Sequence, residues 1–117
     1  MATIINFEDL EIRQEARGLY KKILLLTNRP NVKKDFKFRA QFVEAAGSVM
    51  DDIAEGFEPD SRLEFINFLS IAKGSSGEVR SQLYRGLDME YWSEGESARY
   101  VRNIRILLPI LQISSNT

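Results

Sequence analysis

The stretch from Ala45 to Glu78 constrains the fold of this chain more than any other part of the sequence. Small residues gather at its two ends, Ala-Ala-Gly-Ser at 45–48 and Ala-Lys-Gly-Ser-Ser-Gly at 72–77, and the acidic turn Glu-Pro-Asp at 58–60 lies between them. The distance between two packed helices depends on the side chains at their contact, and small side chains allow a close approach. We therefore expect a helical hairpin whose arms meet through these small residues.

Gly74 and Gly77 test whether the second arm is one helix or two. Each glycine costs about 1 kcal/mol relative to alanine in a helix interior, so the pair could break the helix. Against a break, small and apolar residues keep an alternating spacing of three and four across the glycines, which a loop would have no reason to preserve. We predict one helix over 61–89, with the glycines allowing close helix approach. The residues that keep the spacing are Leu69, Ala72, Ser76, Val79 and Leu83.

The rest of the chain predicts three further helices, at about 7–27, 35–57 and 93–112, with a loop at 28–34 that contains Pro30. Serine followed by glutamate three residues later, at Ser61 and again at Ser93, fits a capping box at the start of a helix. Four amphipathic helices with short links predict one all-α domain over 1–117, an antiparallel up-down-up-down four-helix bundle. Its other inward residues are Ile12, Ala16, Leu19, Tyr20, Ile23, Thr27, Phe38, Phe42, Ala45 or Ala46, Val49, Ile53, Val101, Ile104, Leu108 and Leu111.

The chain contains neither cysteine nor histidine. The absence of cysteine excludes disulfides and thiolate metal sites, and the absence of histidine removes the usual general base and metal ligand. We expect a protein that is not an enzyme and holds no cofactor. No apolar run approaches the roughly 20 residues of a membrane span, and the N-terminus lacks a signal-peptide pattern, so we expect a cytoplasmic protein without a membrane partner.

Asp51, Asp52 and Glu55 form the one dense carboxylate cluster. Carboxylates could hold Mg²⁺ or Ca²⁺, which leaves a metal-dependent enzyme as a distant alternative. Metal sites in helix bundles draw their ligands from several helices, however, and this cluster comes from a single turn. A solvated acidic face is the favoured interpretation.

The third and fourth predicted helices carry more apolar residues than one inward stripe requires. Large exposed apolar patches usually mark interfaces, so we expect self-association into a homo-oligomer, with scattered surface residues as the alternative. The candidate oligomer interface consists of Leu63, Ile66, Ile106, Ile110 and Ile113.

Basic residues concentrate between Arg13 and Arg39, and acidic residues between Glu44 and Glu64, although the net charge is only −1. The two segments could be solvated faces that attract each other within or between subunits. Alternatively, a basic rim near the loop at 28–34 could contact the phosphates of RNA, DNA or a nucleoprotein. The residues of this basic rim are Arg29, Lys33, Lys34, Lys37 and Arg39. A second basic row, Arg99, Arg102 and Arg105, lies on the fourth predicted helix.

Several short motifs resemble those of the 23S rRNA intervening-sequence proteins, a four-helix-bundle family. Phe-Glu-Asp-Leu at 7–10 resembles the family's opening, and three central motifs resemble its core: Ala-Ala-x-Ser from Ala45, Ile-Ala-Glu-Gly from Ile53, and Ala-x-Gly-Ser-x-x-Glu from Ala72. The resemblance covers nearly the whole chain. It defines the helix-packing motif that we predict, which consists of Ala45, Ala46, Ser48, Ala54, Glu55, Gly56, Ala72, Gly74, Ser75 and Glu78.

This resemblance implies a small bacterial protein that assembles as a pentamer and has no catalytic residues. A related group, the accessory variability determinant proteins of diversity-generating retroelements, binds nucleic acid through a strongly basic surface. This chain departs from the pattern at Val43, Glu44 and Asp52, and in its slight negative charge. The favoured function is a non-enzymatic interaction or adaptor protein linked to RNA or ribosomes, and the alternative is direct RNA or DNA binding through the basic rim.

Overall fold

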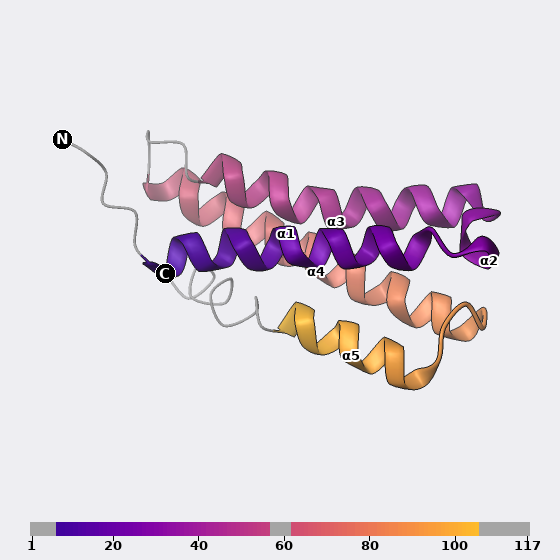
Figure 1. Cartoon of the computed structure of the whole chain (residues 1–117). Helices are drawn as coiled ribbons and strands as arrows, with labels where there is room; N and C mark the ends of the chain where they lie inside the picture. Colours follow the sequence, from indigo (N-terminus) through magenta and orange to yellow (C-terminus); the bar gives the residue numbers. More distant parts are fainter. Residues whose placement is uncertain (1–6, 57–61, 106–117) are drawn as a thin grey trace.

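The computed structural model describes residues 7–56 and 62–105, and these residues form helices joined by short connections, without a strand. The helices are α1 (Phe7–Thr27), α2 (Pro30–Lys33), α3 (Phe36–Gly56), α4 (Arg62–Asp88) and α5 (Glu94–Arg105). In Figure 1, α1 lies beside α3, α4 packs along α3, and α5 packs along α4. The predicted all-α fold is thus confirmed. The part of the fourth predicted helix beyond residue 105 lies outside the described residues.

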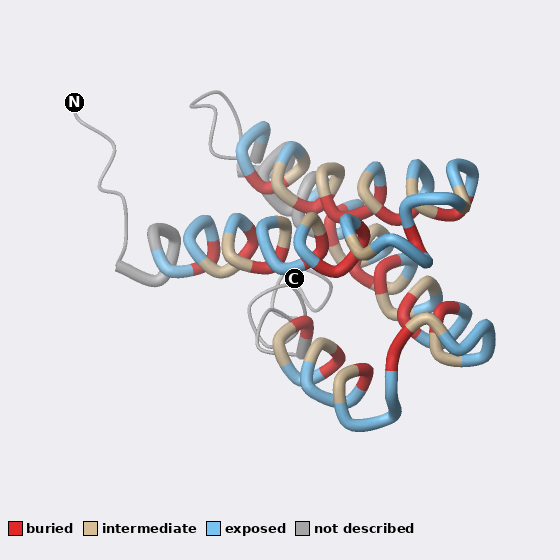
Figure 2. The backbone as a smooth tube through the Cα atoms, turned by 45° about the vertical axis from the view of Figure 1, so that its right-hand side comes forward, coloured by how far each residue is buried: buried red, intermediate tan, exposed pale blue. Residues whose placement is uncertain are grey.

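The buried side chains follow the inner face of each long helix (Figure 2). The predicted inward stripes are confirmed wherever side chains are described, with Tyr20 only partly buried. Burial of such aliphatic and aromatic side chains is the main stabilising term of the bundle, at about 1.5–3 kcal/mol for each large side chain. The largest fully buried side chains are Phe42, Ile12, Ile23, Leu26, Ile53, Leu83 and Ile104.

The connection between α1 and α3, predicted as a loop, contains the single helical turn α2. Pro30 begins this turn, which suits its fixed φ and its missing N–H. Val32 is fully buried and anchors the turn on the core. The turn therefore depends on the burial of one apolar side chain. A segment of four residues is too short to show a helical periodicity, so the sequence pattern did not predict it.

Helix α4 runs without a break through Gly74 and Gly77, as predicted. The predicted role of Gly74 in the hairpin contact is wrong for the described part of the chain, because there a Cβ atom at Gly74 or Gly77 would find no atom within 4 Å outside the backbone of its own helix. Ala72 and Ser76 point into the bundle, and Gly74 lies about 200° around the helix from each of them. Small residues are buried on both of these packed helices, namely Ala45 and Ala46 on α3 and Ala72 and Ser76 on α4.

The corner after α4 ends the helix in a Schellman motif. The Tyr91 N–H donates to the Gly86 carbonyl at 2.9 Å, and the Glu90 N–H donates to the Leu87 carbonyl at 3.0 Å. Glu90 takes the left-handed conformation, with φ of 62°, that this motif requires. The turn sends Trp92 back over the helix it has just left, where its Nε1 donates to the Leu83 carbonyl at 2.9 Å.

Trp92 fills the space beside Gly86. The indole is 5% exposed and packs against Phe38 and Phe42, with ring centroids 5.9 and 5.8 Å away. A Cβ atom at Gly86 would overlap the indole ring. Gly86 is therefore the glycine of α4 that close packing requires, and sequence analysis did not single it out.

Candidate functional site

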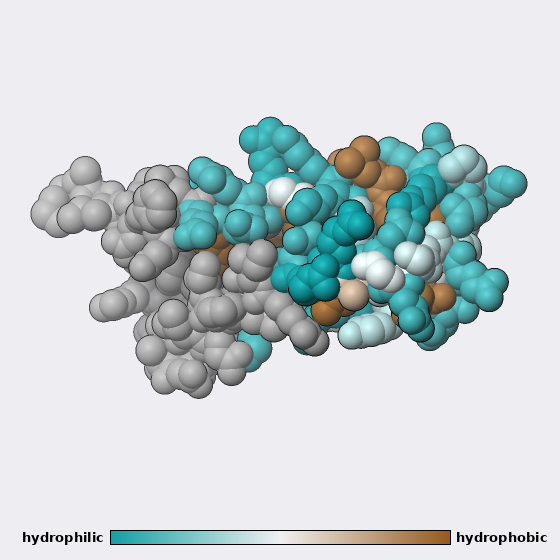
Figure 3. Space-filling model, turned by 60° about the horizontal axis from the view of Figure 1, so that its bottom comes forward, coloured by the Kyte–Doolittle hydropathy of each residue, from teal (hydrophilic) through white to brown (hydrophobic). Residues whose placement is uncertain are grey.

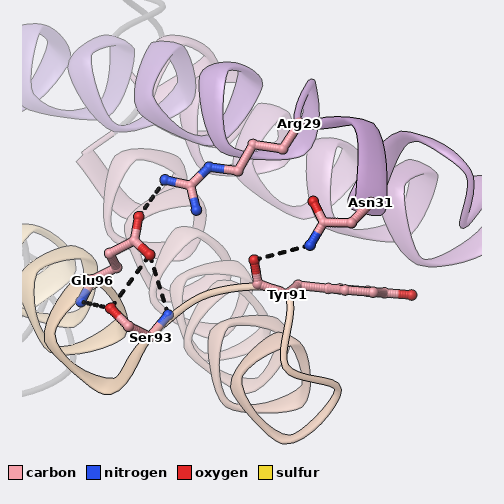
Figure 4. A network of polar contacts seen from close by, with 5 residues as sticks. All are labelled: Arg29, Asn31, Tyr91, Ser93 and Glu96. Atoms are coloured by element: carbon pink, nitrogen blue, oxygen red, sulfur yellow. Dashed lines mark hydrogen bonds and ion pairs between the residues drawn. The ribbon is translucent and has the colours of Figure 1, made fainter.

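The two connections at one end of the bundle are joined by polar contacts (Figure 4). Arg29 forms an ion pair with Glu96, and Asn31 Nδ2 donates to the Tyr91 carbonyl oxygen at 3.3 Å. Glu96 also completes the predicted capping box, since the Ser93 N–H donates to Glu96 Oε1 at 3.2 Å and the Glu96 N–H donates to Ser93 Oγ at 3.2 Å. We call this set, with Asp35, the polar clasp.

Asp35 has two roles within the clasp. Its Oδ1 accepts the Phe38 N–H at 3.2 Å, which caps α3, and its Oδ2 accepts the Tyr91 hydroxyl at 2.7 Å. The Tyr91 hydrogen bond, followed by that from Phe38, lowers the pKa of Asp35, and the same bond to Asp35 raises the pKa of Tyr91. Each oxygen of the Asp35 carboxylate therefore accepts a hydrogen bond from a group of this chain.

The residues of the predicted basic rim fall into two groups, according to whether their side chains make polar contacts within the chain. Arg29 pairs with Glu96, and Arg39 Nη2 donates to Asn28 Oδ1 at 3.1 Å. The other three members, Lys33, Lys34 and Lys37, are exposed. The lysines have exposed side chains, whereas Arg29 is paired with a carboxylate, so the lysines are the stronger candidates for a nucleic-acid contact.

Phe36 lies among these lysines and is 80% exposed. The sequence contains the signal for this, because Phe38 and Phe42 are four residues apart on one face and Phe36 is two residues from Phe38. We call Lys33, Lys34, Phe36 and Lys37 the lysine surface.

The rest of the predicted helix-packing motif is divided between the helix contact and the outer surface. Ser75 Oγ donates to Asp52 Oδ2 at 3.3 Å, which links α4 to α3, and Ser48 is half-buried in the groove between them. Ala54, Glu55 and Glu78 are exposed. Glu78 lines the same groove between α3 and α4 as Ser48, and Ala54 lines a groove between α3 and α1. Gly56 is the last residue of α3.

Asp52, in the carboxylate cluster, has a raised pKa. Partial burial raises its pKa, the Ser75 hydrogen bond opposes this, and the charges of Glu55 and Asp51 add to the increase. Within residues 7–56 and 62–105, no group of three or more acidic side chains is placed to hold a metal ion.

The candidate oligomer interface cannot be compared with the structure. Ile106, Ile110 and Ile113 lie outside the described residues, and the side chains of Leu63 and Ile66 are also outside them. On the face in Figure 3, the described surface is mostly hydrophilic, with small separate apolar patches. Exposed large apolar side chains among the described residues are Leu25, Phe36, Ile71, Tyr84 and Met89.

An outward stripe of small residues runs along α4 with spacings of four and three and ends at a half-exposed tyrosine. Beyond it, Tyr84 lines a groove of about 450 Å³ between α4 and α5, together with Leu87, Ala98 and Val101. Ser97, on the wall of this groove, is buried, and its Oγ has no hydrogen-bond partner among the described residues. We call the stripe the glycine face; it consists of Ser70, Gly74, Gly77, Ser81 and Tyr84.

None of the described helices combines the length and the apolar character needed to cross a membrane. Comparison with curated proteins finds no match. Among solved structures, the chain is similar to a protein of unknown function from the S23 ribosomal protein family of Bacteroides thetaiotaomicron, with a TM-score of 0.85 and 21% sequence identity over 95% of this chain and all of the other. At that identity the likeness establishes the fold alone. The model of the 23S rRNA-intervening sequence proteins matches residues 8–112, and the chain therefore belongs to this family.

Proposed function

We propose that this protein is a non-enzymatic interaction module that works as a homo-oligomer, in the cytoplasm, as an adaptor linked to RNA or ribosomes. Its subunit is an antiparallel up-down-up-down bundle, an arrangement supported by the polar clasp, which joins the α1–α3 and α4–α5 connections at one end. The resemblance of the sequence to its family implies a pentamer. A chain without histidine or cysteine favours a surface function over catalysis.

The glycine face carries this proposal. Gly74 and Gly77 each weaken α4 by about 1 kcal/mol relative to alanine. Among the described residues, no atom outside the backbone of α4 itself would contact a Cβ atom at either position, so packing within this part of the subunit does not explain the two glycines. A backbone from a second copy that approaches α4 closely would explain them, because small residues allow two helices to pack at short distance.

The groove beyond Tyr84 extends the same surface. It offers apolar Leu87 and Ala98 to a partner, beside the aromatic ring of Tyr84. A continuous surface that combines small residues with an apolar groove resembles the core of an interface more than an ordinary solvated face.

Light scattering coupled to size-exclusion chromatography tests the proposal. We expect the wild-type chain to elute as an oligomer at micromolar concentration, and Gly74→Leu to elute as a single chain with its helical circular dichroism intact. The matched control is Gly18→Leu on α1, where a Cβ atom likewise meets nothing within 4 Å. A monomeric wild type would contradict self-association, and an oligomeric Gly74→Leu would exclude the glycine face as the interface.

The second candidate function is direct RNA or DNA binding through the basic rim, by analogy with the retroelement accessory proteins, the group from which this chain departs in its slight negative charge. The outward position of Lys33, Lys34 and Lys37 favours it. Binding through phosphates should weaken steeply as salt rises, and each lost phosphate contact should lower that dependence by about one unit of slope. Labelled RNA at low salt should therefore bind the wild type and not the triple variant with Glu at these positions. Equal binding by both proteins would exclude the basic rim.

A further inference from the structure

We propose that the lysine surface binds single-stranded nucleic acid, with an unpaired base stacked on the Phe36 ring and the neighbouring phosphates held by Lys33, Lys34 and Lys37. This inference rests on the second proposed function and specifies its ligand. It adds a base-contacting residue, Phe36, that charge patterning does not indicate.

The first argument is the exposure of Phe36. Burying a phenylalanine contributes about 1.5–3 kcal/mol, and the other two aromatic side chains of the same helix start, Phe38 and Phe42, are buried against Trp92. Phe36 is 80% exposed and gives the subunit almost none of this stabilisation. Its ring is therefore available to a ligand.

The second argument is the fixed backbone position of Phe36. Phe36 is the first residue of α3, and Asp35, which precedes it, caps that helix through the Phe38 N–H. Tyr91 holds the Asp35 carboxylate from the other side. A stacking platform on a capped helix end loses little conformational freedom on binding, which favours affinity.

The third argument is the local charge. Asp35 is the one acid between Lys33 and Lys37, and its oxygens face Tyr91 and the Phe38 N–H. The corner that Asn31 contacts carries exposed Asp88 and Glu90, which repel phosphates. A bound strand should therefore follow the side of α2 and the start of α3, away from that corner.

An unpaired strand fits this combination better than a duplex. An aromatic ring needs the free face of a base, which single strands offer and paired helices hide. Lysines beside the ring contact phosphates without reading sequence. We expect binding with little sequence preference.

Fluorescence anisotropy with labelled 15-nucleotide oligo(U) and oligo(dT), and with a duplex of the same length, tests the proposal. We expect both single strands to bind at 50 mM salt more tightly than the duplex. Phe36→Ala should weaken single-strand binding about tenfold without changing the salt dependence, because stacking carries no charge. Phe36→Tyr should restore binding. Leu25→Ala, a change at another exposed apolar residue, on α1, should leave binding unchanged.

The lysines provide a separate readout. Lys33→Glu and Lys37→Glu should lower both affinity and salt dependence, whereas Lys21→Glu on α1 should affect binding much less. In Phe36→Trp, the bound strand should quench the fluorescence of the new indole. In the wild type, where buried Trp92 is the single tryptophan, the same strand should leave the fluorescence unchanged.

The outcomes separate the stacking inference from the proposed function beneath it. Loss of binding in the lysine variants with full binding by Phe36→Ala would overturn the stacking site and leave the basic rim standing. No binding of any oligonucleotide at 50 mM salt would overturn both. Equal affinity for the duplex, or displacement of oligo(U) by an equal charge of poly-glutamate, would show a general polyanion surface and would also overturn the proposal.

Discussion

Two regions of α4 use glycine for opposite purposes. Around Gly86 the helix is covered by Trp92, which the Schellman turn folds back over it, and no space for a methyl group remains. Around Gly74 the outer face of the helix is exposed, and a methyl group would meet nothing among the described residues. Packing within the subunit explains Gly86, whereas no packing among the described residues explains Gly74.

The same contrast extends to the surroundings of the two regions. The end of the bundle near Gly86 combines an aromatic cluster with the polar clasp, and both are satisfied within the chain. The region near Gly74 has the Ser75–Asp52 hydrogen bond and, on its outer side, exposed small residues. Stability should therefore be most sensitive to change at the first region, and assembly most sensitive to change at the second.

The largest effect should come from Gly86→Ala. The added methyl group would overlap the indole of Trp92, which is held by its hydrogen bond to Leu83 and by Phe38 and Phe42. We expect a loss of about 3 kcal/mol of unfolding free energy, at the upper end of overpacking effects. Urea unfolding followed by helical circular dichroism measures this, because that signal does not depend on the single tryptophan.

Combining Gly86→Ala with Trp92→Leu provides the control, because the double variant should lose clearly less than the sum of the two single changes. Additive losses would show that the indole and the added methyl group do not meet.

The same substitution twelve residues earlier should have the opposite sign. Gly74→Ala adds a methyl group in open space and improves the helix propensity, so we expect a gain of about 1 kcal/mol for the dissociated subunit. Thermal unfolding in dilute solution, below the assembly midpoint, measures it. A loss of stability in this variant would support the intrachain contact that the sequence analysis predicted for Gly74. It would also show that the two regions do not differ in the way described.

Within the clasp, Glu96→Gln should cost less than about 1 kcal/mol at pH 7, because the Arg29–Glu96 side chains are 39% and 29% exposed and solvent screens the pair. Glutamine can still complete the capping box with Ser93, so this change isolates the ion pair. The hydrogen bond from Arg29, followed by that from Ser93, lowers the pKa of Glu96 from 4.5 to about 2.

A folded-state pKa below the unfolded value stabilises the protein above the unfolded pKa. The difference between the wild type and Glu96→Gln should therefore be constant above pH 5 and disappear as pH falls from about 4.5 to about 2. Unfolding free energies across this range measure the effect, and a difference that persists at pH 2 would point to lost capping.

The smallest effect should come from Asp52→Asn, near Gly74. Burial, with the charges of Glu55 and Asp51, raises the pKa of Asp52, so its contribution to stability is present below pH 3.8 and is lost as pH rises through the folded-state value. Asparagine at position 52 keeps an oxygen that can accept the Ser75 hydrogen bond, and it removes the negative charge of the carboxylate. We expect a gain of about 0.5 kcal/mol at pH 7 that shrinks at low pH. Asp51→Asn, at an exposed position, is the control, and an equal gain there would show a general charge effect.

Periodicity predicted the long helices and their inner faces because each has a stripe of apolar residues that must be buried. It also contained the information that Gly74 faces outward, since Gly74 is out of phase with Ala72 and Ser76. The pairing of Gly86 with Trp92 could not be predicted in this way, because it depends on the left-handed turn at Glu90. The polar clasp could not be predicted for a similar reason, because the residues that it joins are far apart in the sequence.

The polar clasp also has a consequence for folding kinetics. The Tyr91–Asp35 bond joins residues 56 positions apart, and the Arg29–Glu96 pair joins residues 67 positions apart. Closing such long loops costs more chain entropy than pairing α3 with α4, which follow each other directly in the chain. We expect the α3–α4 pair to form before the transition state and the clasp to close after it. Interactions that form late slow unfolding without speeding folding. The clasp would then determine how long the folded subunit survives, while the hairpin would determine how quickly it forms.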